Sequence, residues 1–397
     1  MMKNLKKLLA LLLALAMLLS LAACSGSEND DAEEDTEATE EAGAASEIKT
    51  LIEKGEYEKA YDKLIALENP TAEEEALLEG FRFMLTKATF GADVLEYTYN
   101  DDGLPTSVYM TEYDEWMKTE ITYNADGKIA QVKESSNDAG GYSITTTYAY
   151  DDKGNKVSEN STGTDGETSI TTYTYDQNGN LMTKSYSSSN GYSSSFTYDQ
   201  NGNTLTESYT SSDGSKWSDL YSYDDKGNIL SDIYTSSDGS VSTTTWTYSY
   251  DEKGNILTKV QTDGYGDTDT RTYTYDDKGN MLTENYTSSG GNWQTITYTY
   301  DENGNRLTED CVDAYGYAYK ETCTYDAKGN MLTDNYINSN SDSWIDTYTY
   351  DKYSNCLTKK DIYNGEINTY TYSWKLYYNP KYADEDYMAA FADFFYF

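Results

Sequence analysis

One motif, Tyr-Asp-x-x-Gly-Asn, returns along most of the chain at nearly fixed spacing. Successive copies begin 23 to 27 residues apart, and most are separated by 25. A fixed period in this range is typical of stacked repeats, in which each unit contacts its neighbours, rather than of a fold built around one central site. The tyrosines of the motif are Tyr150, Tyr175, Tyr198, Tyr223, Tyr250, Tyr275, Tyr300, Tyr325 and Tyr350, and looser copies begin at Tyr99 and Tyr123.

Each unit has the pattern of a β-hairpin. Thr272-Tyr273-Thr274-Tyr275 alternates strongly β-prone residues, and Leu282 to Tyr286 return as a second strand. Asp276 can cap backbone amides in the turn, and Gly279 can adopt the positive φ that a short hairpin loop needs. The sequence therefore predicts a mainly β fold over residues 93–376: a repeat array of antiparallel β-hairpins, running as a meander or solenoid with an open or curved sheet.

The register decides which side chains are buried together. Tyr273 and Tyr275 share one face because side chains alternate along a strand. Whether Leu282 joins them depends on a bulge at the glycine, which changes the parity by one residue. We expect tyrosine and leucine to form the buried face, and serine, threonine, aspartate and asparagine to form the solvent face.

Two segments flank the array. Residues 48–90 carry apolar stripes of helical spacing, and Thr71-Ala72-Glu73-Glu74 predicts a capping box. The stretch from Gly55 to Ala60 resembles the middle of a tetratricopeptide repeat. One such unit cannot form a groove, so the resemblance implies a helical cap or spacer, with peptide binding as the alternative. Residues 377–397 are rich in aromatic residues and are predicted to cap the last strand.

The N-terminal residues have the pattern of an export signal. A basic start is followed by an apolar run from Leu8 to Leu19, which is too short to span a bilayer. Leu21-Ala22-Ala23-Cys24 resembles the lipobox of bacterial lipoproteins. This resemblance implies that residues 1–23 are a cleaved signal peptide and that Cys24 carries the lipid, whereas an ordinary secretory signal is the alternative.

The residues after Cys24 are strongly acidic. Ten carboxylates and no basic residue lie between Glu28 and Glu47. Such a segment cannot build a core, so residues 24–47 are predicted to be a disordered tether. We therefore expect an exported protein that is lipid-anchored at the bacterial cell membrane or outer membrane and faces the extracellular side.

Charge and composition exclude several classes of function. The net charge is −40, and removal of residues 1–23 would leave about −43. Such a charge disfavours nucleic acid and anionic lipid headgroups, and favours neutral ligands, cationic ligands or metal ions. The chain has no histidine, which removes the commonest general base and metal ligand. We predict that the protein is not an enzyme.

Two cysteines replace aligned tyrosines of neighbouring repeats. Cys311 and Cys323 have the same separation in sequence as Tyr286 and Tyr298. If the two positions face each other on adjacent strands, a disulfide is feasible in an exported protein. The alternative is two unrelated buried thiols. Cys356 has no evident partner.

The repeats resemble the YD repeats of Rhs proteins, insecticidal toxin-complex shells and teneurins over about residues 97–374. The resemblance lies in the Tyr-Asp-x-x-Gly core, the period and the number of copies. It implies hairpins coiled into a β-sheet shell or spiral, with cell-surface contact and carbohydrate binding. The residue after glycine is almost always asparagine here, where that family often has arginine. Because the array is short for a sealed shell, we expect an open sheet.

These observations favour a cell-surface binding or adhesion protein that contacts carbohydrate. The partners would be the membrane, through Cys24, and a polysaccharide or surface protein, with no nucleic acid. A non-catalytic structural or protein-interaction scaffold is the alternative. Calcium bound by the aspartate turns is a further alternative, although aspartate as a turn cap needs no metal. The candidate ligand-binding aromatic residues, expected in or beside the connecting loops and second-strand ends, are Trp217, Trp246, Trp293 and Trp344.

Overall fold

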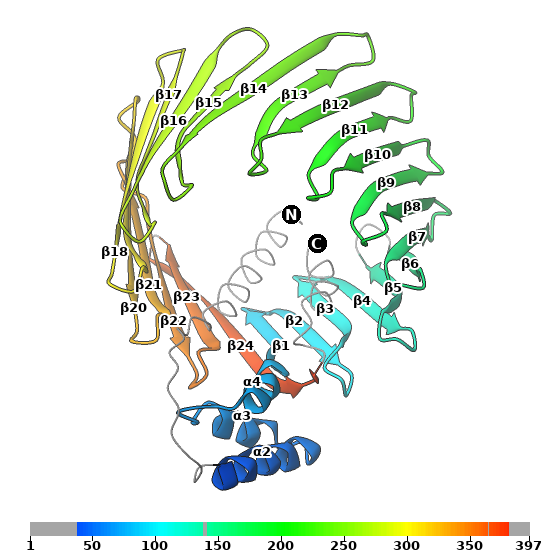
Figure 1. The fold of residues 1–397 in the computed structure, drawn as a ribbon, viewed down its shortest axis with the longest axis vertical. Helices are drawn as coiled ribbons and strands as arrows, with labels where there is room; N and C mark the ends of the chain where they lie inside the picture. Colours follow the sequence, from blue (N-terminus) through cyan, green and yellow to red (C-terminus); the bar gives the residue numbers. More distant parts are fainter. Residues whose placement is uncertain (1–37, 138–140, 364, 381–397) are drawn as a thin grey trace. The chain divides into compact units, whose positions relative to one another are not determined.

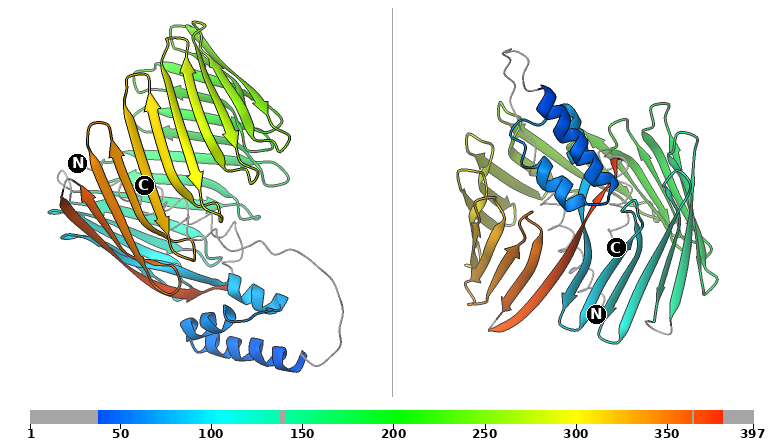
Figure 2. Two further views of the ribbon diagram at one scale, coloured as in Figure 1. Left: turned by 90° about the vertical axis from the view of Figure 1, so that its left-hand side faces the viewer. Right: turned by 90° about the horizontal axis from the view of Figure 1, so that it is seen from below.

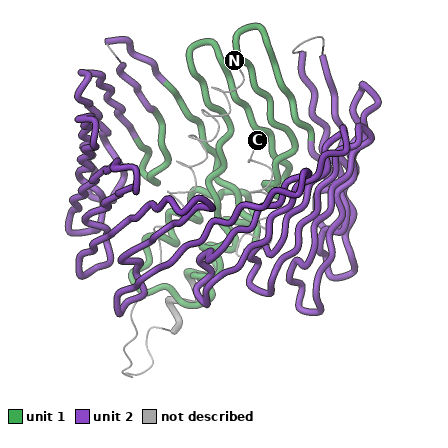
Figure 3. Tube along the Cα trace, turned by 90° about the horizontal axis from the view of Figure 1, so that it is seen from above, with its two compact units in different colours: residues 1–120, 350–358, 370–397 green, residues 121–349, 359–369 purple. Residues whose placement is uncertain are grey.

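The computed structural model describes residues 38–137, 141–363 and 365–380. The predicted signal peptide, Cys24 and nearly all of the C-terminal cap lie outside the described residues. The chain divides into two compact units (Figure 3). The first comprises residues 1–120, 350–358 and 370–397, and the second comprises residues 121–349 and 359–369. Among the described residues, no helix is both long enough and apolar enough to cross a membrane.

Three helices precede the strands in the described chain: α2 (Ala38–Glu53), α3 (Tyr57–Leu64) and α4 (Ala72–Glu79). The capping box at the start of α4 is confirmed. The Glu74 amide donates to Thr71 Oγ1, and the Thr71 amide donates to Glu74 Oε2. This reciprocal pair satisfies two amides that the helix itself leaves without partners.

The helices pack on the first and last strands of the sheet (Figure 2). Tyr61 of α3 contacts Phe83 edge to face, with ring centroids 5.4 Å apart. Asp62 pairs with Lys352 at 2.6 Å, which ties the same helix to a turn of the first unit. The fully buried members of this core are Ile48, Ala60, Leu64, Leu77, Phe81 and Leu376.

The predicted boundaries of the helical segment were wrong at both ends. Helix α2 begins at Ala38, within the predicted tether of residues 24–47, because an alanine-rich stretch with good helix propensity leads into the buried Ile48. The first strand begins at Phe81, before the predicted limits of 90 and 93. Residues from Phe81 to Phe90 form a strand because they pair along residues 370–378.

The described strands number 24 (Figure 1). Their bounds are β1 (Phe81–Phe90), β2 (Asp93–Tyr99), β3 (Pro105–Glu112), β4 (Glu115–Tyr123), β5 (Ile129–Ser136), β6 (Tyr142–Tyr150), β7 (Lys156–Gly163), β8 (Thr168–Tyr175), β9 (Leu181–Ser188), β10 (Ser193–Tyr198), β11 (Thr204–Thr210), β12 (Lys216–Tyr223), β13 (Ile229–Thr235), β14 (Val241–Tyr250), β15 (Ile256–Thr262), β16 (Thr268–Tyr275), β17 (Met281–Ser288), β18 (Trp293–Tyr300), β19 (Arg306–Asp313), β20 (Ala318–Tyr325), β21 (Met331–Asn338), β22 (Ser343–Tyr350), β23 (Cys356–Tyr363) and β24 (Glu366–Tyr378).

The strands belong to one sheet, and the first strand pairs with the last. Phe81 lies opposite Tyr378, and Phe90 lies opposite Tyr370, with the two strands antiparallel. The rings of Phe90 and Tyr370 stack, with centroids 4.6 Å apart. The prediction of an open sheet is therefore wrong, because the hydrogen-bonding order is closed. Pairing β1 with β24 removes the unpaired edges that an open sheet would expose.

A bulge near the start of the second strand of each hairpin sets the register. Thr274 pairs with Thr283, but Tyr275 pairs with Met281, so Leu282 is the extra residue. The same shift recurs at Tyr175, Tyr223, Tyr300 and Tyr325. Leu282 is 36% exposed. The expectation that leucine and tyrosine share a buried face is therefore wrong.

The sheet thus has two chemically different faces. We call the face that carries Tyr273, its cross-strand partner Glu284, and Tyr275 the tyrosine face. The opposite face, which carries Thr274 and Thr283, is the threonine face, and the hydroxyl oxygens of these two residues lie 2.7 Å apart. Charged residues lie among the tyrosines, so the half-buried face is aromatic and ionic rather than aliphatic.

Candidate functional site

The aspartate of the motif caps its own turn. Asp301 Oδ1 accepts hydrogen bonds from the amides of Asn303 (2.8 Å) and Asn305 (2.9 Å), and Oδ2 accepts from the Asn305 side chain at 2.8 Å. The hydrogen bond from the Asn305 side chain is the main cause that lowers the pKa of the Asp301 carboxyl. Both carboxylate oxygens are engaged within the turn, which favours the capping role. Calcium binding by these turns stays a prediction.

The tyrosine of the motif links neighbouring repeats. In most copies its hydroxyl donates to the main-chain carbonyl that follows the previous turn, at 2.8 or 2.9 Å, whereas the Tyr250 hydroxyl donates to Asp224 Oδ2. This carbonyl belongs to the residue at the bulge, beyond the end of the regular ladder to the next strand. The donor and acceptor pairs are Tyr175 with Lys156, Tyr223 with Thr204, Tyr275 with Ile256, Tyr300 with Met281, and Tyr325 with Arg306.

The four candidate tryptophans lie in strands rather than in loops. Trp217 and Trp344 are on the tyrosine face, where each packs flat on a cross-strand tyrosine. The rings of Trp344 and Tyr336 are 3.6 Å apart at 8°, and those of Trp217 and Tyr209 are 5.2 Å apart at 14°. One face of each of these two indoles is therefore covered by a tyrosine ring.

Trp293 differs from the other three. It is the first residue of β18, lies opposite Thr287 on the threonine face, and is 43% exposed. Its strand neighbour Gln294 belongs to the tyrosine face. The structure therefore does not bring the four predicted aromatic residues together into one platform.

Trp246 adjoins a hollow on the tyrosine face. Its Nε1 donates to Gln261 Oε1 at 3.2 Å, and Gln261 lines a hollow of about 360 Å³. Because the Gln261 carbonyl accepts from the indole, its amide N–H₂ group is directed to other acceptors. The residues that line this hollow are Lys259, Gln261, Asp269, Arg271 and Tyr273.

The polar side chains of the hollow come from two adjacent strands, β15 and β16. Lys259 lies directly opposite Arg271, and Gln261 lies directly opposite Asp269. Arg271 Nη1 donates to Glu284 at 2.5 Å, and its guanidinium lies 5.1 Å from the centroid of the Tyr286 ring. The site therefore combines two cations with an amide and a carboxylate.

Asp269 is held from the side by Tyr286. The Tyr286 hydroxyl donates to Asp269 Oδ1 at 2.9 Å, and this bond is the main cause that raises the pKa of the Tyr286 phenol. Asp269 Oδ2 takes no part in this hydrogen bond. The arrangement presents hydrogen-bond donors and acceptors at one place, which suits recognition of a hydroxyl-rich ligand.

Sequence reasoning singled out Trp246 but missed Lys259, Gln261, Asp269, Arg271 and Tyr273. A signal was present. Counting by the 25-residue period, Glu309 and Glu321 occupy in a later repeat the positions that Lys259 and Arg271 occupy here. Two bases at positions that hold two acids elsewhere mark this repeat as different.

The condition for a disulfide between Cys311 and Cys323, that the two positions face each other on adjacent strands, is not met, and the alternative of two separate buried thiols describes the structure. Cys311 lies opposite Tyr319, whereas Cys323 lies further along β20 and opposite Asp334. Both thiols are buried and free. The residue opposite Cys311 is Tyr319, which precedes Cys323 on the same strand. The two cysteines therefore lie on the same face of the sheet but are not cross-strand partners.

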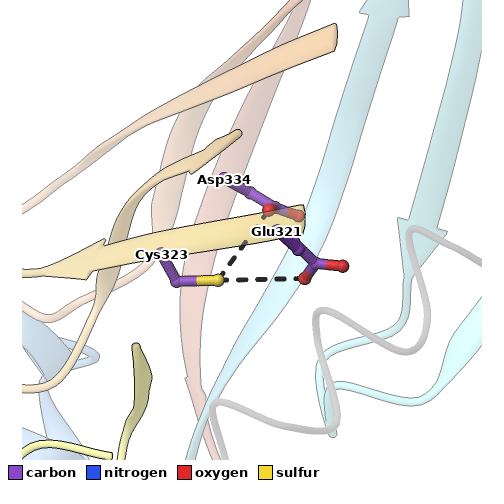
Figure 4. Close-up of side chains that lie close together, drawn as sticks. All are labelled: Glu321, Cys323 and Asp334. Carbon is purple, nitrogen blue, oxygen red and sulfur yellow. Dashed lines mark hydrogen bonds between the residues drawn. The ribbon is translucent and has the colours of Figure 1, made fainter. Parts of the chain in front are cut away.

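Cys323 lies between two carboxylates (Figure 4). Its thiol donates to Glu321 Oε1 at 3.9 Å and to Asp334 Oδ1 at 3.8 Å. Burial, followed by the charges of Asp334 and Glu321, raises the pKa of the Cys323 thiol to about 11, so at neutral pH it is a thiol and not a thiolate. Arg306 also donates to Glu321. The group has metal-ligand atoms, but the Cys323 thiol acts here as a hydrogen-bond donor to two carboxylates.

The threonine face has a second hollow, of about 400 Å³. Its lining includes Val312, Ala318 and Ile337, and the Val312 and Ile337 side chains are 40% and 53% exposed. Asp310 and Lys320 also line it and pair at 2.9 Å. This hollow is more apolar than the one on the tyrosine face.

Fold and site together define a β-rich repeat protein of antiparallel hairpins with a polar hollow on its aromatic face. No protein-family model matches the chain, and no curated protein sequence matches it. Among solved structures, it is similar to the TcdB2-TccC3-Cdc42 complex, at 13% identity over 73% of this chain with a TM-score of 0.29.

Two further solved structures are similar at low scores. TcdB2-TccC3 without its hypervariable C-terminal region matches 71% of the chain at 13% identity and a TM-score of 0.36. The chain spans 18% of the length of each of the two TcdB2-TccC3 chains. A porin-like protein from Bacteroides uniformis matches 59% of this chain and 95% of its own, at 14% identity and a TM-score of 0.23. Similarities at this level say nothing about what this chain binds.

Proposed function

We propose that this chain is a non-catalytic, cell-surface binding protein that contacts carbohydrate through the tyrosine face of its repeat sheet. The observation that carries the proposal is the hollow at β15 and β16. It presents Gln261, Asp269 and Arg271 together, beside an indole that is hydrogen-bonded to Gln261. Sugar hydroxyls need donors and acceptors side by side, and an adjacent aromatic ring covers the apolar face of a pyranose.

The proposed location rests on the N-terminal sequence. The lipobox-like Leu21-Ala22-Ala23-Cys24 would make Cys24 the lipidated residue, and the repeats would be of the YD type found in Rhs proteins. A lipid anchor would hold the array at the bacterial envelope, where glycans are abundant. Mass spectrometry of the chain purified from a bacterial membrane fraction tests this directly, because Cys24 should be the N-terminal residue and carry acyl chains. Recovery of the unprocessed N-terminus, or of an unmodified cysteine, would contradict the anchor.

Binding of the purified full chain to a panel of neutral and acidic oligosaccharides tests the function. We expect saturable binding to at least one glycan, and loss of most of that binding in Trp246→Phe, which keeps an aromatic ring but removes the donor to Gln261. Trp293→Phe is the matched control, because Trp293 lies on the threonine face. Absence of binding to every glycan, with the chain folded, would remove the carbohydrate proposal.

A protein-interaction scaffold is the second candidate, and the hollow at Val312 and Ile337 favours it. Two partly exposed aliphatic side chains beside a Lys320–Asp310 ion pair suit a small protein contact. Binding of a partner by addition of a strand to the sheet is less suitable here, because the edges of β1 and β24 already pair with each other. Ile337→Asp should abolish capture of a surface-protein partner while leaving glycan binding unchanged.

A further inference from the structure

We propose that the hollow at β15 and β16 holds the anionic group of an acidic sugar, with Lys259 and Arg271 as the anion-binding pair. This inference rests on the proposed carbohydrate function and names the ligand class of the same site. The two cations are direct cross-strand partners on the tyrosine face. Like charges placed directly opposite each other destabilise a sheet, and Glu284 compensates only the Arg271 side of this pair, so an anion between the two cations would reduce the remaining repulsion.

The basic pair contrasts with the rest of the tyrosine face. At the corresponding positions of other repeats, Glu309 lies opposite Glu321, and Asp334 lies opposite Asp346. The chain as a whole has 69 acidic and 29 basic residues. In a protein of this composition, two opposed bases lining one hollow distinguish this repeat from its neighbours.

The two cations have donors available for a ligand. Lys259 takes part in none of the ion pairs found among the described residues, and its Nζ lies 6.0 Å from the centroid of the Tyr248 ring. Arg271 gives Nη1 to Glu284, and a guanidinium has five N–H donors in all. A carboxylate or sulfate group can therefore accept from both side chains.

The neighbouring groups suit the rest of a sugar. Gln261 and Asp269 are the next cross-strand pair on the same face of these two strands. Gln261 can donate to a ring or hydroxyl oxygen, and Asp269 can accept from a hydroxyl. A site that offers cations at one end and an amide and a carboxylate at the other fits a sugar with one acidic group, such as a uronic acid.

The net charge of the chain limits the length of the ligand. At physiological salt, charges are screened over a distance of roughly 8 Å, so the basic pair governs the potential only close to the hollow. A long polyanion would approach the acidic surface around it. We therefore expect a terminal or isolated acidic sugar to bind, rather than a densely charged polymer.

The test compares matched oligosaccharides with the full chain: a neutral oligosaccharide, the same backbone ending in a uronic acid, and the same backbone carrying a sulfate ester. We expect the acidic forms to bind at least about tenfold more tightly than the neutral one, since hydrogen bonds to charged groups are the stronger kind. Inorganic sulfate and acetate serve as competitors. Competition by the free anions as strong as by the sugars would overturn the proposal of a sugar site.

Variants at two equivalent repeat positions separate the pair from general charge effects. Lys259→Met should reduce affinity for the acidic form by about tenfold and leave the neutral form unchanged. Lys184→Met is the matched control, because Lys184 lies opposite Phe196 and not opposite a base. Equal binding of neutral and acidic forms, or equal effects of the two variants, would overturn this inference and leave carbohydrate binding standing. No binding to any form would overturn the proposed function itself.

Discussion

The hydroxyl of Tyr300 donates a hydrogen bond of 2.9 Å to the main-chain carbonyl of Met281, in the preceding repeat. The carbonyl lies at the bulge, beyond Thr283 and Thr297, where the ladder between β17 and β18 ends. The bond thus extends the pairing of two repeats past the last main-chain contact. It explains why the motif has tyrosine and not phenylalanine at this position.

Tyr300→Phe should lower the free energy of unfolding by about 1 kcal/mol, which is the usual contribution of one hydrogen bond of this kind. Urea denaturation followed by circular dichroism measures the change. Tyr265→Phe is the control, because Tyr265 is 95% exposed. Equal effects of the two substitutions would show that the hydroxyl of Tyr300 does not stabilise the array.

A second prediction concerns Ser341, which adopts φ = 69° in a connecting turn where Gly316 adopts φ = 79° one repeat earlier. A left-handed conformation costs a non-glycine residue about 1–2 kcal/mol, offset in part by the greater chain entropy of glycine. Ser341→Gly should therefore stabilise the protein by about 0.5 kcal/mol or more.

The reciprocal change, Gly316→Ser, should destabilise it by a similar amount. Nothing lies within 4 Å of a Cβ added at Gly316, so the cost would be conformational and not steric. Chemical denaturation of both variants checks the pair. Changes of the same sign in the two variants would contradict this account.

Acidic residues predict a stability maximum at mildly acidic pH. Burial, followed by the charge of Asp346, raises the pKa of Asp334, and burial, followed by the charges of Asp232 and Glu207, raises the pKa of Asp219. A carboxyl whose folded-state pKa is raised destabilises the folded chain when it is ionised. Stability from this source therefore increases as the pH falls from neutral through the raised pKa.

The turn aspartates act in the opposite direction at lower pH. Hydrogen bonds from the Asn305 side chain and turn amides lower the pKa of Asp301 from 3.8, so its contribution is present above that value and is lost as the pH falls through the folded-state pKa. The melting temperature should therefore rise as the pH falls from neutral towards 3.8, and should decrease at lower pH.

Asp334→Asn should reduce the rise in melting temperature between pH 7 and pH 5. Asparagine cannot ionise, so the repulsion with Asp346 is removed at every pH. Asp225→Asn, at an exposed turn position, is the control and should keep the rise. An unchanged pH profile in Asp334→Asn would contradict the role assigned to this pair.

The two aligned cysteines should behave as independent thiols. Because Cys311 and Cys323 have different cross-strand partners, adding a reductant to the folded protein should leave the melting temperature unchanged. Peptide mapping after alkylation under denaturing, non-reducing conditions should find both residues alkylated. A peptide pair linked through these two residues would require a different register of β19 and β20.

Trp344 and Trp293 should respond differently to truncation. Trp344→Ala removes an indole stacked at 3.6 Å on Tyr336, and an aromatic pair alone contributes about 0.5–1.5 kcal/mol. Trp293→Ala removes a side chain that is 43% exposed, and its effect on stability should be small. Thermal denaturation of the two variants distinguishes them, and equal losses would contradict the assigned environments.

Much of the fold follows from the period of Tyr275 and its equivalents. Alternation in Thr272-Tyr273-Thr274-Tyr275 fixes the strand, and Asp276 with Gly279 fixes the turn. Local sequence does not fix the pairing of β1 with β24, because that contact joins the two ends of the array, which lie far apart in the sequence. The bulge at Leu282 could not be predicted either. With or without it, the side chains on the buried face would form a plausible core.

The candidate site was less predictable than the fold. Trp246 could be selected by residue type, but its importance comes from Gln261, which lies opposite it only in the observed register. Lys259 and Arg271 have the same separation in sequence as Cys311 and Cys323. Lys259 and Arg271 lie directly opposite each other, whereas Cys311 and Cys323 do not. The reason is that the two pairs are placed differently relative to the turn that connects their strands.

The pairing of β1 with β24 restricts how such a gene can lengthen or shorten. When the order of strand pairing is closed, the last strand can lie antiparallel to the first only if the number of strands is even, and the described chain has 24. Each copy of the motif contributes two strands, so duplication or loss of a whole repeat unit keeps this parity. Loss of half a unit would bring the two end strands together in parallel. Recombination between copies in register is therefore tolerated by the architecture, whereas an insertion of one strand is not.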